Sequence, residues 1–140
     1  MPAKTGYDTD VLDLEDLTSN GAPVDPRHLK RIEVMQFVFA YGFALDPAQQ
    51  QQFLLDHPDL AELIEQIPPI DQDIQSLAAE RPVLDINKVD LAILRSIVFE
   101  WKTRKTPKKV LIDEAVELAK EFGTESSPKF VNGVLAHLFK

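Results

Sequence analysis

Two pairs of carboxylates are the first candidates for chemistry in this chain. Asp71 and Asp73 lie two residues apart, and Asp113 and Glu114 are adjacent. Paired carboxylates can transfer protons or bind a divalent metal, but a metal site also needs histidine, cysteine or further acids that converge on it. The chain has no cysteine, and its three histidines are scattered along it, at His28, His57 and His137. We therefore expect both pairs to lie on solvated helix faces, and we predict no catalytic residue, no metal site and no cofactor.

Glycine and hydroxyl residues also lack the patterns that nucleotide or nucleophilic chemistry requires. The five glycines are isolated, so the sequence has no glycine-rich loop that could hold phosphate. Serine and threonine occur mainly where helix caps are expected, and no histidine is placed to activate one of them. The absence of cysteine rules out disulfides and thiolate chemistry. We do not expect an enzyme.

Positive charge gathers in two clusters that contain no acid, residues 27–31 and residues 101–109. The net charge of -8 repels polyanions at long range, but residues 1–26 alone hold six acids against one lysine. Cationic surfaces are therefore available locally for a polyanionic partner, and the alternative is that both clusters are solvated helix ends. Several aromatic residues near the clusters could stack on bases, although their helical spacing favours the core: Phe37, Phe39, Tyr41, Phe43, Phe99 and Trp101.

Length and composition are those of one ordinary globular domain. The chain has 140 residues, of which 44% are hydrophobic and 27% charged. No apolar run approaches the roughly 18 residues that a membrane-spanning helix needs. The N-terminus lacks the basic start and apolar stretch of a secretory signal. We expect a cytoplasmic protein without a membrane partner.

The apolar residues recur at helical spacing, and no segment alternates as a strand would. We predict an all-α fold of about seven helices in two packed subdomains of about three helices each. Residues 1–24 are expected to form a mobile acidic arm, and residues 25–140 one helical domain. Gly133, inside the last helix, is expected to permit a close contact between helices.

Proline, glycine and capping residues set the expected helix limits. Asp25 and Pro26 open a helix to about Ala44, and Asp46 and Pro47 open a short one through Leu55. His57 and Pro58 separate it from a helix over residues 60–67, which Pro68 and Pro69 end, and a fourth follows over residues 70–79. A central buried helix is predicted over residues 87–101. Thr106 and Pro107 cap a helix that stops at Gly123, and Ser127 and Pro128 cap the last one.

Three segments of the C-terminal half, residues 87–95, 109–120 and 125–135, resemble the NusB family of bacterial transcription antitermination factors. The clearest is the run Lys-Phe-Val-Asn-Gly-Val-Leu at residues 129–135. At the front, residues 27–31 resemble the arginine-rich start of the family's first helix, and residues 35–39 resemble its Leu-Gln-Ala-Leu-Tyr segment. The resemblance covers about residues 27–138, and the family fold is all-α with two helical subdomains.

The resemblance implies binding of boxA-type single-stranded RNA together with the ribosomal protein NusE, in support of rRNA operon transcription. It also implies indirect association with the RNA polymerase antitermination complex, as a monomer or a homodimer. Carried over by position, the phosphate-binding residues are Arg27, Lys30 and Arg31, and the residues near bases are Gln36 and Phe130. The positions that meet the protein partner are Phe39 and Asp90.

The chain also departs from the family pattern. Ser126 stands where the family commonly has aspartate, His28 stands among usual arginines, and Phe37 fills a usual alanine position. The acidic arm is an addition. An alternative is therefore a NusB-like protein-interaction module with weak or lost RNA binding. The RNA-binding domain of an rRNA methyltransferase is disfavoured, because 140 residues leave no room for a cofactor-binding domain.

Overall fold

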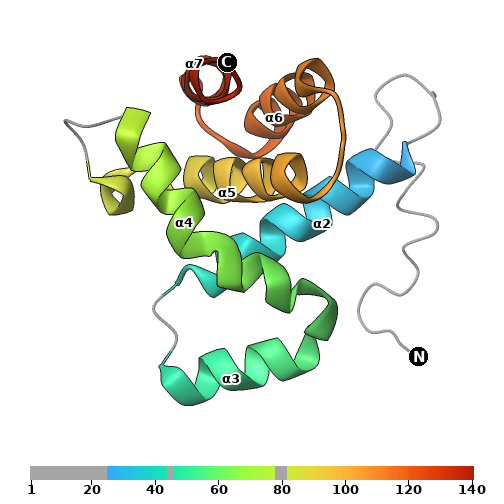
Figure 1. Cartoon of the computed structure of the whole chain (residues 1–140), viewed down its shortest axis with the longest axis vertical. Coiled ribbons are helices and arrows are strands. Elements are labelled where there is room, and N and C mark those ends of the chain that lie inside the picture. The colour runs from blue at the N-terminus through green and yellow to red at the C-terminus, as the bar shows by residue number, and fades with distance from the viewer. Residues whose placement is uncertain (1–24, 44–45, 78–81) are drawn as a thin grey trace. The chain divides into compact units, whose positions relative to one another are not determined.

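The computed structural model describes residues 25–43, 46–77 and 82–140, so the predicted arm of residues 1–24 lies outside the described residues (Figure 1). The described residues form six α-helices, two short 3-10 helices and no strand, which confirms the predicted all-α fold. The elements are α2 (Pro26–Tyr41), α3 (Pro47–Asp56), η2 (Pro58–Leu60), α4 (Ala61–Leu77), η3 (Val83–Asp85), α5 (Lys88–Thr103), α6 (Lys108–Phe122) and α7 (Ser127–Leu138). The chain divides into two compact units, residues 1–31 and 32–140.

The predicted starts of three helices are confirmed by their side-chain caps. The Oδ1 atom of Asp25 accepts the backbone N–H of Arg27 at 2.9 Å at the start of α2. Asp46 and Gln49 form a reciprocal capping box at α3, with bonds of 2.8 and 2.9 Å. Asn87 Oδ1 accepts two N–H groups of the first turn of α5. Each cap pairs backbone donors that the helix itself leaves unpaired.

One predicted boundary is wrong, because α4 continues through Pro68 and Pro69. An interior proline removes a helical hydrogen bond and costs roughly 3 kcal/mol. The apolar residues on both sides of the prolines are nevertheless buried in one core: Leu63, Ile64, Ile70 and Ile74. Burial of each such side chain contributes about 1.5–3 kcal/mol, which offsets the proline penalty. The predicted helices over residues 60–67 and 70–79 are therefore one helix, and the predicted ends at residues 44 and 79 lie outside the described residues.

Two predicted caps are also wrong, because the hydroxyl groups bond elsewhere. Thr106 donates its hydroxyl to Glu100 Oε2 at 2.8 Å, and α6 has no side-chain cap. In the turn before α7, Ser127 Oγ accepts the backbone N–H of Thr124 at 2.8 Å, and the N-cap residue is Ser126. Both hydroxyls thus order the turn that precedes a helix.

Helix α5 is the centre of the larger unit, as its apolar sequence predicts. Nine consecutive residues from Asp90 to Val98 are buried. The helix contacts α4, α6 and α7, and Figure 1 shows it lying between α4 and the pair formed by α6 and α7. Helices α6 and α7 contribute fully buried apolar residues to the same core: Leu111, Ala115, Leu118, Val131 and Leu135. Phe122 is 37% exposed because it lies at the last position of α6.

An aromatic cluster joins the second half of α2 to α3. The ring of Phe37 lies 4.8 Å from the ring of Phe53 and 5.0 Å from that of His57, centroid to centroid. Tyr41 is 6.0 Å from Phe53. Such tilted and edge-on pairs are favourable beyond their burial. The cluster explains why phenylalanine fills position 37, where the NusB resemblance suggests alanine.

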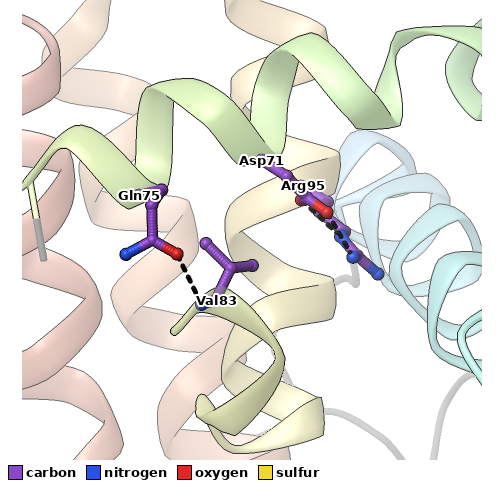
Figure 2. A network of polar contacts seen from close by, with 4 residues as sticks. All are labelled: Asp71, Gln75, Val83 and Arg95. Atoms are coloured by element: carbon purple, nitrogen blue, oxygen red, sulfur yellow. Dashed lines mark hydrogen bonds and ion pairs between the residues drawn. The ribbon is translucent and has the colours of Figure 1, made fainter. Parts of the chain in front are cut away.

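Asp71 and Asp73, the first pair of acids considered for chemistry, form ion pairs from α4 to α5. Arg95 donates to both carboxylate oxygens of Asp71, at 2.8 and 2.7 Å (Figure 2). Asp73 pairs with Lys102 Nζ at 2.9 Å. One turn beyond Asp71, Gln75 accepts the backbone N–H of Val83 at 2.8 Å and ties α4 to η3 (Figure 2). The expectation of a solvated helix face is therefore wrong for Asp71, whereas the side chain of Asp73 is 41% exposed.

Candidate nucleic-acid and partner interface

The basic start of α2 belongs to the unit of residues 1–31. Arg27 and Lys30 are exposed and Arg31 is half-buried. Their spacing of three and four residues puts the three cations on one face of the helix. The backbone N–H of Arg27, and then its guanidinium at 3.6 Å, hold the pKa of Asp25 below its ordinary value. The acid that begins the helix thus stays ionised beside the cations.

The residues predicted to lie near bases belong to the unit of residues 32–140. Gln36 is exposed on α2 between two buried neighbours, so its amide is accessible to a ligand. Phe130 lies in the first turn of α7, half-buried and packed against the core. Its ring therefore contributes to the core in part and leaves a part accessible for stacking.

The turn between α6 and α7 fixes the position of Phe130. Besides accepting the Thr124 N–H, the fully buried Ser127 hydroxyl lies 3.2 Å from the Thr124 hydroxyl. A Cβ atom at Gly123 would lie 2.5 Å from Ser127 Oγ and 2.9 Å from the carbonyl oxygen of Ala119. Only glycine permits this close approach, since real Cβ contacts are longer. An open hollow of about 340 Å³ lies over the turn and is lined by Thr124, Glu125 and Ser126.

The prediction that Gly133 permits a close contact between helices is wrong. A Cβ at Gly133 would meet no atom within 4 Å, so the residue lies against open space on the exposed face of α7. The contact is made at Gly123, which the sequence predicts only as a helix end. Thr124 and Ser127 lie three residues apart, which is the spacing of a side-chain cap. This spacing was the sequence signal for a turn that hydroxyl groups order.

The two residues predicted to meet a protein partner differ in environment. Phe39 is half-buried on α2, with its ring edge-on to that of Phe43 at 4.7 Å. Asp90 is only 6% exposed, in the first turn of α5. Its Oδ1 atom is buried and has no hydrogen-bond partner within the described part of the chain. A buried carboxylate oxygen without a donor is unfavourable, and a donor outside the chain could reach it only if the side chain turned toward the surface.

The described ranges contain no group of three or more His, Cys, Asp or Glu residues that could hold a metal ion. Among the helices that the structure describes, none is both long and apolar enough to cross a bilayer.

The fold and the arrangement of these residues define an all-α protein built around a central buried helix. Comparison with known proteins gives the family. The family profile "NusB family" matches residues 49–140, and the chain belongs to this family.

Relatives and a solved structure agree with this assignment. The chain is 38% identical over 126 residues to the transcription antitermination protein NusB of Chloroflexus aggregans, covering 78% of this chain and 83% of the relative. It is 36% identical over 107 residues to the NusB protein of Thermoanaerobacter sp. strain X514, covering 76% and 75%. The structure of T. maritima NusB matches with a TM-score of 0.66 and 29% identity, over 81% of this chain and 90% of that one.

Proposed function

We propose that this chain is a transcription antitermination factor, not an enzyme, that binds boxA-type single-stranded RNA together with ribosomal protein NusE and supports rRNA operon transcription. The observation that carries the proposal is the family match over residues 49–140, which includes Phe130 and Asp90. Two curated relatives matched over three quarters or more of their length bear the name transcription antitermination protein NusB. The protein would act in the cytoplasm and associate with RNA polymerase through the complex it joins.

The physical chemistry of the surface supports RNA as a ligand. Arg27, Lys30 and Arg31 put three cations on one helix face, although the whole chain carries -8. Cations that neutralise phosphates give a salt-dependent affinity without sequence preference, and stacked or hydrogen-bonded bases add the preference. Gln36 and Phe130 have the chemistry for that second role, an amide and an accessible aromatic face.

Asp90 supports a protein partner. When the side chain turns toward the surface, its Oδ1, which is buried and unpaired in this structure, would accept a hydrogen bond from a lysine, arginine or backbone N–H of NusE. A charge-assisted bond of this kind is about twice as strong as a neutral one. Phe39 would add apolar contact area.

The RNA part is tested by a salt titration of a boxA RNA and a scrambled RNA, with and without NusE. We expect selective binding of boxA that NusE strengthens. The double variant Arg27→Ala/Lys30→Ala should bind both RNAs more weakly. It should also lower the slope of log affinity against log salt by about 1.4, at about 0.7 for each lost contact. Lys88→Ala/Lys120→Ala removes the same charge from exposed positions elsewhere and should leave the slope unchanged.

Base recognition is tested by Phe130→Ala, which should reduce the preference for boxA over the scrambled RNA. Phe43→Ala, at a 47% exposed ring, is the control for loss of an aromatic group. An equal affinity for both RNAs at all salt concentrations, with or without NusE, would refute the proposed function.

The protein contact is tested with Asp90→Asn, which keeps the shape and removes the charge. We expect weaker binding to NusE and unchanged binding to RNA alone, whereas Asp113→Asn on the exposed face of α6 should change neither. NusE binding without any RNA selectivity would instead favour the alternative of a NusB-like protein-interaction module.

A further inference from the structure

The second basic cluster of the sequence has no part in the function proposed above. Four of its side chains are exposed between the end of α5 and the first turn of α6, and we name them the α5–α6 basic patch: Arg104, Lys105, Lys108 and Lys109. None of the four forms an ion pair or hydrogen bond through its side chain within the part of the chain that the structure describes. Lys102 is excluded from the patch because it pairs with Asp73.

Acids near the patch do not neutralise it. Glu100 accepts the Thr106 hydroxyl at 2.8 Å, which orders the connection that carries the patch. Asp113 follows Lys109 by one helical turn without an ion pair between them. The patch therefore presents four positive charges over a short stretch of chain, none of them in an ion pair within the described residues.

The position of two of these charges argues against a simple solvated helix end. Lys108 and Lys109 occupy the first turn of α6, which contains no acid and has no side-chain cap. Cations at this end of a helix oppose its dipole, so they disfavour the helix they belong to. A contribution to folding does not explain them, whereas an anionic ligand would be attracted by all four side chains together.

We propose that the α5–α6 basic patch binds the phosphate backbone of RNA that flanks the boxA element. The inference rests on the proposed RNA-binding function and extends its footprint. Flexible lysines contact phosphates without reading bases, so the patch would add affinity and no sequence preference. An RNA ligand is favoured over an acidic protein because the same unit already offers Phe130 and Gln36 for bases.

The distance along α6 sets the length of RNA required. The helix has 15 residues, so about 20 Å separates the patch from the turn that leads to Phe130. This distance corresponds to roughly six stacked nucleotides at 3.4 Å each. A short boxA RNA bound at Phe130 would end before the patch, and a longer RNA would reach it.

The test compares three RNAs: a short boxA RNA, the same RNA extended by about eight nucleotides of arbitrary sequence on each side, and a scrambled RNA of the extended length. Each is titrated with the full chain carrying Lys108→Ala/Lys109→Ala, with the control Lys88→Ala/Lys120→Ala, and with the unaltered chain. Alanine is a good helix former, so the patch variant is expected to fold, which circular dichroism checks.

For the patch variant we expect both long RNAs to bind roughly 25-fold more weakly at 0.1 M salt, about fivefold for each lost contact. Its salt slope should fall by about 1.4, while binding of the short boxA RNA stays unchanged. Equal binding of the long RNAs by the patch and control variants would overturn the proposal. That result is the one expected if the patch bound a protein and not RNA. Loss of boxA selectivity with the patch effect intact would refute the proposed function and leave this surface as a general RNA contact.

Discussion

Replacing Gly123 by alanine should destabilise the protein, whereas the same change at Gly133 should stabilise it. Gly123 has a φ of -95°, so its backbone conformation is open to any residue and only the space for a Cβ is at issue. That Cβ would lie 2.6 Å from Ser127 Cβ and 2.9 Å from the Ala119 carbonyl oxygen, neither of which is the end of a flexible side chain. At Gly133 nothing lies within 4 Å.

The magnitudes follow from these two surroundings. Overpacking costs typically about 1–3 kcal/mol, and displacement of Ser127 would also lose the Thr124 hydrogen bond, worth about 1 kcal/mol. Alanine also restricts the unfolded chain, which stabilises the folded protein by about 0.4–1 kcal/mol. The free energy of unfolding of Gly123→Ala should therefore fall by about 2 kcal/mol. Gly133 lies inside α7, where alanine is favoured by about 1 kcal/mol. The two variants should therefore differ by about 3 kcal/mol.

Urea denaturation followed by circular dichroism and by the fluorescence of Trp101 measures this difference. Trp101 is the single tryptophan, and its ring lies 4.6 Å from that of Phe139 directly after α7. At roughly 3–4 °C for each kcal/mol, the melting temperature should fall by about 7 °C in one variant and rise by about 3 °C in the other. A Gly123→Ala protein as stable as the unaltered chain would refute the close packing of this turn.

Three further predictions concern charges. Arg95→Ala should lower the free energy of unfolding by about 3 kcal/mol in urea denaturation, because it leaves the carboxylate of Asp71 without its partner in a partly buried site; a loss below about 1 kcal/mol would contradict this. Lys108→Ala/Lys109→Ala should raise the melting temperature by a few degrees, since it removes two charges that oppose the α6 dipole, and a lower value would count against that reasoning. The pKa of Asp25 is lowered on folding, so its contribution to the free energy of unfolding is complete above pH 3.8 and is lost as the pH falls through the folded pKa. An NMR titration of the folded protein should give a pKa below 3.8, and Asp25→Asn should remove this dependence of stability on pH.

The sequence by itself determined the helices that short-range chemistry controls. Asp25, Asp46 and Asn87 begin helices because each side chain pairs with donors two or three residues away. The apolar residues of α5 indicated the central helix because they cover a broad arc of its surface, and so wide an apolar face has to be buried. The segments at residues 87–95, 109–120 and 125–135 also identified the family, since they carry its most characteristic residues.

Only the tertiary structure decided the features that depend on residues distant in sequence. Pro68 and Pro69 end a helix by local rules, yet α4 continues through them because burial on both sides outweighs the lost backbone bonds. Asp71 and Arg95 are 24 residues apart, and no periodicity shows that they will pair. The close contact predicted at Gly133 lies at Gly123 for the same reason: a glycine's function depends on which atoms fill the space beside it, and folding alone sets that space.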